Sequence, residues 1–218
     1  ISKEGEALIG KPIGNYITME LGNMEYSNQT LQTVSFEISN QILNLLSEDN
    51  PKSILVVGLG NWNITPDSLG PRTVEKLKVT RHILKYDGDF FGDNTKSISC
   101  ISPGVLGITG IETSEMVKGI VEKVKPDVVI AIDALAARKL DRVSTTIQIS
   151  DTGISPGSGV GNKRKEISIK TIGVKVIAIG VPTVVDAATM ANDAIDLMIE
   201  SLITVAKRDV QFYNMLKN

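Results

Sequence analysis

Three short, uninterrupted apolar runs constrain the fold of this chain more than any other feature. They span residues 54–59, 128–132 and 176–179 and are rich in valine and isoleucine. Runs of this length and composition are typical of strands that are buried on both faces, as in parallel sheets. Helical patterns separate the runs, so the sequence predicts an α/β protein with a mainly parallel, twisted sheet and helices on both faces.

Periodicity predicts the elements around these runs. Residues 15–21 alternate as a half-buried strand does. A helix is expected at about residues 28–47, with an inner face formed by Leu31, Val34, Ile38, Ile42 and Leu45. Further helices are expected from Pro71, from Thr113 to just before Pro126, and at about residues 187–206. The last of these would pack through Ile195, Met198, Ile199 and Leu202.

Length and composition exclude several classes of protein. The 218 residues are enough for one domain with a full core, and we expect a single domain over residues 1–218. A formal net charge of -2 provides no overall basic field to recruit nucleic acid directly. No apolar run reaches the roughly 18 residues of a membrane span. The single cysteine, Cys100, excludes an internal disulfide and indicates a reducing compartment.

Two aspartates follow buried strands and are the candidate catalytic pair. Asp67 lies in the loop after the first apolar run, and Asp133 comes directly after the second. Ligands of open α/β sheets bind outside the carboxyl ends of the strands, so both side chains are expected at one crevice. Two neighbouring carboxyl groups can activate water, because one accepts its proton while the other stays protonated and polarises a carbonyl. The alternative for each is a helix cap or a turn.

The loop of Asp67 belongs to a long motif. Residues 58–71 (GLGNWNITPDSLGP) strongly resemble the signature of the germination proteases of spore-forming bacteria. Further blocks that fit this family are residues 79–82, 107–113, 131–138, 145–153, 157–165 and 181–187. The match covers most of residues 1–200. Motifs of this length and order are highly specific.

The resemblance implies an endopeptidase that degrades small acid-soluble spore proteins during germination, in the cytoplasm of the forespore or spore core. It also implies a zymogen, a homotetramer and an atypical aspartic mechanism without a cofactor, with the two aspartates at Asp67 and Asp133. We expect the pro-segment of the family and part of its C-terminal region to lie outside this chain. The expected fold resembles that of hydrogenase-maturation peptidases and of phosphorylase/hydrolase-like enzymes.

Five further residues are candidates for supporting or substrate-binding roles. Asn61 would fix the first loop, and Gly104 would let a second loop approach a peptide backbone closely. Arg138 follows Asp133 and would stabilise a carboxylate or bind an acidic substrate residue, unless it forms a surface ion pair. Lys163 and Arg164 lie in a glycine-rich loop that would hold substrate or a neighbouring subunit, or would simply be solvated.

Three alternative functions share parts of this pattern. Hydrogenase-maturation endopeptidases place metal-binding acids where Asp67 and Asp133 stand, but they need a histidine after the second acid, and the single histidine, His82, precedes it. We therefore predict no catalytic metal. Peptidyl-tRNA hydrolase also has a Thr-Arg-His triplet, but here the flanking residues predict a core strand and a structural His82. A non-catalytic sporulation protein on the same fold is the third.

One short motif resembles a different class of peptidase. Asp151-Thr152-Gly153 matches the Asp-Thr-Gly of pepsin-like enzymes, which are all-β proteins in which two such segments meet. Only one copy occurs here, within an α/β pattern. We therefore interpret residues 151–153 as a loop after a strand.

Overall fold

The sheet and the helices of this chain come from a computed structural model, which describes residues 1–22, 24–25, 27–47, 49–86, 95–158, 161 and 164–216, and side chains as far as residue 208. Within these residues one sheet has the strand order β1-β5-β6-β4-β2-β3. The strands are β1 (Tyr16–Glu20), β2 (Ser53–Gly58), β3 (Ser97–Ile101), β4 (Val128–Ala137), β5 (Thr146–Ser150) and β6 (Lys175–Val185). Strands β6, β4, β2 and β3 pair in parallel, whereas β5 pairs in the antiparallel sense with both β6 and β1.

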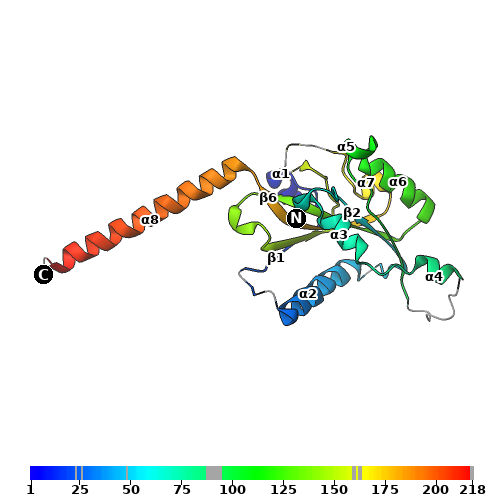
Figure 1. Cartoon of the computed structure of the whole chain (residues 1–218), viewed down its shortest axis with the longest axis horizontal. Coiled ribbons are helices and arrows are strands. Elements are labelled where there is room, and N and C mark those ends of the chain that lie inside the picture. The colour runs from blue at the N-terminus through cyan, green and yellow to red at the C-terminus, as the bar shows by residue number, and fades with distance from the viewer. Residues whose placement is uncertain are drawn as a thin grey trace.

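Helices lie on both faces of the sheet, as predicted (Figure 1). The α-helices are α1 (Lys3–Ile9), α2 (Asn28–Leu46), α3 (Leu69–Glu75), α4 (Arg81–Tyr86), α5 (Leu106–Thr109), α6 (Thr113–Val124), α7 (Ile169–Ile172) and α8 (Ala187–Leu216). Short 3-10 turns cover Thr65–Asp67 and Leu140–Arg142. Ser27 caps α2 by accepting a hydrogen bond from the Thr30 amide, and Lys125 ends α6 in the left-handed conformation just before Pro126.

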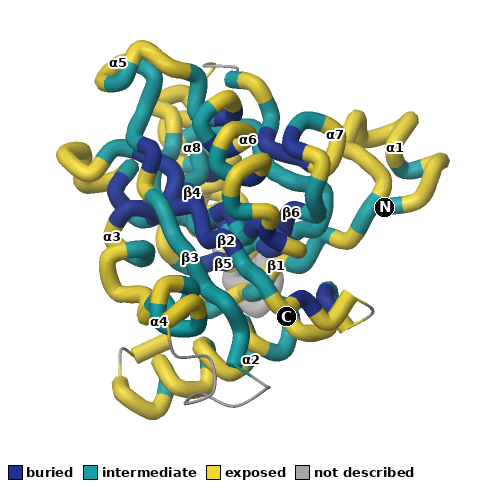
Figure 2. The backbone as a smooth tube through the Cα atoms, turned by 90° about the vertical axis from the view of Figure 1, so that its right-hand side faces the viewer, coloured by how far each residue is buried: buried dark blue, intermediate teal, exposed yellow. Residues whose placement is uncertain are grey.

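The core has two halves, one on each face of the sheet. Side chains of α6 and α7 cover one face, where Val57, Ala131 and Val117 are buried together. Helix α2 covers the other face through Val34, Ile38, Ile42 and Leu45. The deeply buried stretches are the middle segments of β2, β4 and β6 (Figure 2). Because side chains alternate along a strand, the apolar runs supply both halves of the core at once.

Two strands are longer than predicted, and one was not predicted. Strand β4 continues to Ala137 and β6 to Val185, because the two pair with each other beyond the end of β2. Asp133 is therefore inside a strand and not at its end. Strand β3 (Ser97–Ile101) reads Ser-Ile-Ser-Cys-Ile and is half-buried at the sheet edge, so it lacks the apolar run that marks the central strands.

Three predictions about packing were wrong. The apolar residues expected to pack on the inner face of α8 are exposed, and α8 projects away from the sheet and runs on to Leu216 (Figure 1). No glycine or proline interrupts that helix. Leu31 is also exposed, near the start of α2. His82 lies exposed on α4, and not in the predicted core strand.

None of the helices in the described part of the chain combines the length and the apolarity that crossing a membrane requires.

The central position of β6 makes its core residues the main test of the fold. Ile177 is fully buried on the α2 face, so Ile177→Ala is expected to lower the free energy of unfolding by about 2–5 kcal/mol. Ile169→Ala is the matched control, because Ile169 is 60% exposed, and it should change stability by less than about 1 kcal/mol. Urea unfolding followed by circular dichroism measures both. Equal losses in the two variants would contradict this placement of the core.

Candidate active site

Strand β4 brings Asp133 to the sheet face that α6 and α7 cover. Residues two apart in a strand share a face, so Asp133 lies on the same side as Val129 and Ala131. Strand β2 ends opposite Ile132, one residue earlier. The Asp133 side chain therefore stands just past the end of its neighbouring strand, where the apolar layer stops. It is only 5% exposed, and its Oδ1 accepts the backbone N–H of Ala134 at 2.9 Å.

A compact turn after β2 holds Asp67. The Asn61 backbone N–H donates to Asp67 Oδ2 at 2.7 Å, and the same nitrogen lies 3.1 Å from the Asp67 carbonyl oxygen. Gly60 makes this closure possible, because its φ is +111° and a Cβ there would lie 2.0 Å from that oxygen. The Thr183 hydroxyl donates to the Pro66 carbonyl at 2.6 Å, which ties the turn to β6. The predicted role of Asn61 in fixing this loop agrees with these contacts.

Both aspartates line one pocket of about 530 Å³. Its floor is formed by the ends of β2 and β4, and its walls come from the loops after β3 and β5 and from the end of β6. Its lining includes Gly60, Asp67, Asp133, Gly104, Arg138, Arg164, Thr183 and Lys11. The structure thus brings together two segments that are 66 residues apart in the sequence, as the strand-end argument predicted, although Asp133 itself is inside β4.

The two carboxyl groups have different proton affinities. Burial, and then the negative charge of Asp67, raise the pKa of Asp133 to about 7, against the opposing Ala134 N–H. Burial also raises the pKa of Asp67 from its ordinary value, but the Asn61 N–H counteracts this. Near neutral pH, Asp133 therefore holds a proton more readily than an ordinary aspartate does.

The other predicted residues differ in what they contact. Gly104 has a φ of +76° and lines the pocket beside the loop before α5. Arg138 also lines the pocket, is exposed, and takes part in none of the ion pairs found among the described residues. Its predicted alternative as half of a surface ion pair is therefore not supported. Lys163 lies outside the described residues.

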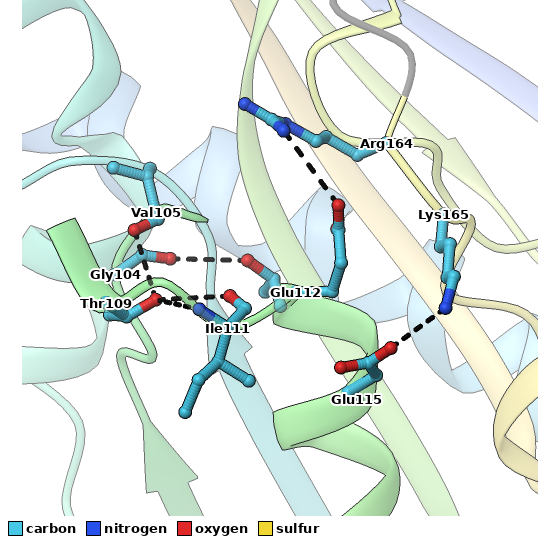
Figure 3. A network of polar contacts seen from close by, with 9 residues as sticks. Gly104, Val105, Thr109, Ile111, Glu112, Glu115, Arg164 and Lys165 are labelled. Carbon is cyan, nitrogen blue, oxygen red and sulfur yellow. Dashed lines mark hydrogen bonds and ion pairs between the residues drawn. The ribbon is translucent and has the colours of Figure 1, made fainter. Parts of the chain in front are cut away.

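Arg164 connects the glycine-rich loop to the start of α6 (Figure 3). Its Nη1 lies 3.9 Å from Glu112 Oε1, and the next residue, Lys165, pairs with Glu115 at 2.8 Å. Thr113 donates to the Gly104 carbonyl at 3.4 Å, so the same helix terminus also contacts the loop after β3. These contacts hold two walls of the pocket against each other. The Arg164–Glu112 pair is long and partly exposed, so it leaves the guanidinium available to a ligand.

Lys11 and Thr183 are among the pocket residues that were not predicted. Lys11 precedes the first strand in sequence, and Thr183 sits in a Pro-Thr step near the end of β6. Thr183 belongs to one of the motif blocks, which could have indicated its importance. Lys11 carries no local signal, because contacts between segments that are distant in the sequence bring it to the pocket.

The described residues contain no group of three or more His, Cys, Asp or Glu side chains arranged to hold a metal ion. Asp67 and Asp133 are the acidic side chains that line the described pocket, and two carboxylates alone hold a transition metal poorly. The absence of a catalytic metal stays a prediction.

A mainly parallel α/β sheet with two carboxyl groups of unlike pKa in a peptide-sized pocket defines this chain as a candidate hydrolase. A family model described as germination protease matches residues 1–216. The chain belongs to the germination protease family, and it is an endopeptidase of spore germination.

Curated relatives agree with the family match. The germination protease of Clostridium tetani (strain Massachusetts / E88) is 52% identical over 219 residues, covering 100% of this chain and 68% of the relative. That of Caldanaerobacter subterraneus subsp. tengcongensis is 53% identical with the same coverage, and that of Bacillus subtilis (strain 168) is 53% identical over 92% of this chain and 55% of the relative. Among solved structures, a [NiFe] hydrogenase maturation protease HycI from Thermococcus kodakarensis KOD1 overlaps with 14% identity and a TM-score of 0.39. The overlap covers 77% of this chain and 99% of that one.

The raised pKa of Asp133 makes stability depend on pH. Below the unfolded value near 3.8 the carboxyl is protonated in both states and contributes nothing. Between that value and about 7 only the unfolded chain loses the proton, so the free energy of unfolding falls as pH rises. Asp133→Asn removes this pH-dependent loss of stability and keeps a side-chain oxygen that can accept the Ala134 N–H. The variant is expected to match the parent at pH 4 and to exceed it at pH 8 by on the order of a few kcal/mol.

Urea unfolding of both proteins at pH 4, 6 and 8 measures the difference. Asp196→Asn serves as the control, because Asp196 is exposed on α8 and its exchange should leave the pH profile of the parent intact. A stability gap between Asp133→Asn and the parent that stays constant with pH would show that Asp133 ionises normally in the folded protein.

Proposed function

We propose that this chain cleaves small acid-soluble spore proteins with one water molecule activated between Asp67 and Asp133. The observation that carries the proposal is the shared pocket, in which one buried carboxyl has a pKa of about 7 and the other is held by an N–H donor. A pair in which one member is ionised and the other protonated can activate water for peptide hydrolysis, because one group accepts a proton and the other polarises the carbonyl.

The difference in environment assigns a role to each aspartate. Asp67, ionised and hydrogen-bonded to Asn61, removes a proton from the water as it attacks the scissile carbonyl carbon. Asp133, protonated, donates its hydrogen bond to the carbonyl oxygen, where negative charge develops. The proton taken by Asp67 then passes to the leaving nitrogen as the C–N bond breaks. Both carboxyl groups return to their initial state after one turnover.

The surroundings of the pair support a peptide substrate. The pocket is lined by the exposed Arg138 and the half-buried Arg164, and Gly104 presents backbone without a side chain. In this proposal Gly104 approaches the peptide backbone, and the two arginines bind carbonyl or carboxylate oxygens of the substrate.

The cellular setting and the assembly are part of the same proposal. We infer that the protein acts in the cytoplasm of the forespore and spore core as a homotetramer derived from a zymogen. The apolar residues exposed along α8, among them Leu197, Met198 and Leu202, support association between copies, because so long an apolar stripe is costly to leave in water. Spore-protein substrates accord with the family of the chain.

Replacing either aspartate tests the mechanism. Asp67→Asn and Asp133→Asn keep the size of each side chain and remove the proton chemistry, so each is expected to lower kcat by roughly 10²–10⁴-fold. The assay is cleavage of a purified small acid-soluble spore protein, with excess chelator in a parallel series. Asp196→Asn is the matched control, and it should cleave as fast as the parent.

Two results would count against the proposal. Normal cleavage by either folded active-site variant would remove that aspartate from the mechanism. Loss of parent activity in chelator, restored by one specific ion, would instead favour the metal-dependent alternative.

The protonated state of Asp133 also predicts a pH profile for kcat. Because Asp133 must carry a proton, kcat is expected to fall as pH rises through about 7. At acid pH, kcat should fall again where Asp67 takes up a proton, above the ordinary aspartate range. Steady-state rates between pH 5 and 9, with circular dichroism confirming the fold at each pH, measure both limbs. A kcat that still rises at pH 9 would exclude Asp133 as the proton donor.

A further inference from the structure

The Asp151-Thr152-Gly153 motif lies outside the catalytic pair but next to the pocket. It follows β5 as a loop, as interpreted from the sequence. Its carboxylate reaches across to the segment between α1 and β1, residues 11–15, which we call the strap. Asp151 Oδ1 accepts the Asn15 backbone N–H at 2.8 Å, and Oδ2 accepts Asn15 Nδ2 at 2.7 Å. Two hydrogen bonds to one carboxylate fix both the position and the orientation of Asn15.

A second set of contacts holds the other end of the strap. Thr152 Oγ1 donates to the Tyr16 hydroxyl at 3.1 Å, and that hydroxyl donates to the Pro12 carbonyl at 2.9 Å. The Lys11 ammonium lies 5.1 Å from the centre of the Tyr16 ring, a cation–π distance. Asp151 thus contacts the end of the strap directly, and Thr152 is linked to its beginning through the Tyr16 side chain.

The strap and the loop pack too closely for any side chain between them. A Cβ on Gly14 would lie 2.3 Å from Thr152 Cγ2 and 2.6 Å from Asp151 Oδ1. A side chain at position 14 would force the Thr152 and Asp151 side chains to shift, so glycine allows the strap and the loop to approach this closely.

This arrangement brings Lys11 to the pocket. Lys11 lines the same pocket as Asp67 and Asp133, yet it enters from a segment more than 50 residues before either. We propose that the strap is a wall of the peptide-binding pocket, that Lys11 contacts the bound peptide, and that Asp151 is the positioning residue that holds this wall in place. The inference rests on the proposed function, because it takes the pocket of the two aspartates as the peptide site.

The hydrogen-bond pattern permits a reciprocal exchange as the test. Asp151→Asn keeps an acceptor for the Asn15 backbone N–H but removes the negative charge, and its amide NH₂ forces the Asn15 side chain to turn Nδ2 away and Oδ1 inward, so the charge-assisted hydrogen bonds are lost. Combining Asp151→Asn with Asn15→Asp restores a donor opposite an acceptor. Asn15→Asp alone places two carboxylates together. A positioning role predicts that both single variants are impaired and that the double variant recovers.

The measurements are kcat and KM for cleavage of a small acid-soluble spore protein, and binding of a fluorescently labelled peptide from it by anisotropy. Asp151→Asn is expected to raise KM and the peptide Kd by about 5-fold, with kcat and its pH dependence unchanged. The double variant should return to within about 2-fold of the parent. Lys11→Met keeps the apolar stem over Tyr16 and removes the charge, so it should raise KM in the same way.

Each outcome separates this inference from the proposed mechanism. If the parent cleaves and Asp67→Asn does not, the catalytic proposal stands, and an unchanged KM in Asp151→Asn and Lys11→Met overturns the strap. A fall in kcat without a rise in KM, or no recovery in the double variant, overturns it as well. If the chain binds peptide without cleaving it, the catalytic proposal fails while the Kd comparison still decides the strap. If no peptide binds, both are wrong.

Discussion

The burial of one carboxyl group beside another is the constraint on which the site depends. Asp133 occupies a position in β4 that alternation assigns to the core face, where a charged group is costly. The cost is reduced because β2 ends opposite Ile132. Asp133 therefore borders the pocket at the place where a further residue of β2 would otherwise lie beside it. The Asp133 carboxyl is therefore buried enough to hold a proton near neutral pH, and it still lines the pocket that a substrate would enter.

The loop of Asp67 limits how far burial raises the pKa of the second carboxyl group. The Asn61 backbone N–H opposes the effect of burial on the Asp67 pKa. This N–H lies close to Asp67 because Gly60 has no side chain to obstruct the tight turn. Thr183 fixes the same loop to β6. The raised pKa of Asp133 thus arises mainly from burial and then from the charge of Asp67, whereas a backbone N–H opposes the rise at each aspartate.

The sequence predicted the features that depend on local pattern. The apolar runs identified the central strands, and the strand-loop argument placed Asp67 and Asp133 at one pocket. Features that depend on pairing between distant segments were missed or misread. The length of β4 follows from its partner β6, β3 is an edge strand without an apolar run, and α8 carries an apolar stripe that nothing in the described chain covers. Lys11 reaches the pocket through the β1–β5 pair and through the contacts of the following loop with Asn15 and Tyr16.

The walls of the pocket differ in how firmly they are held. The floor, with both aspartates, rests on central strands whose side chains are almost fully buried, so its geometry changes only when the fold does. The rim carries Lys11, Arg138 and Arg164, and it is held by exposed hydrogen bonds and by one long ion pair. Such contacts contribute little to stability and are readily exchanged. The chemistry of the site is consequently fixed by the sheet, whereas the affinity for a given peptide can change at the rim without disturbing the proton balance between Asp67 and Asp133.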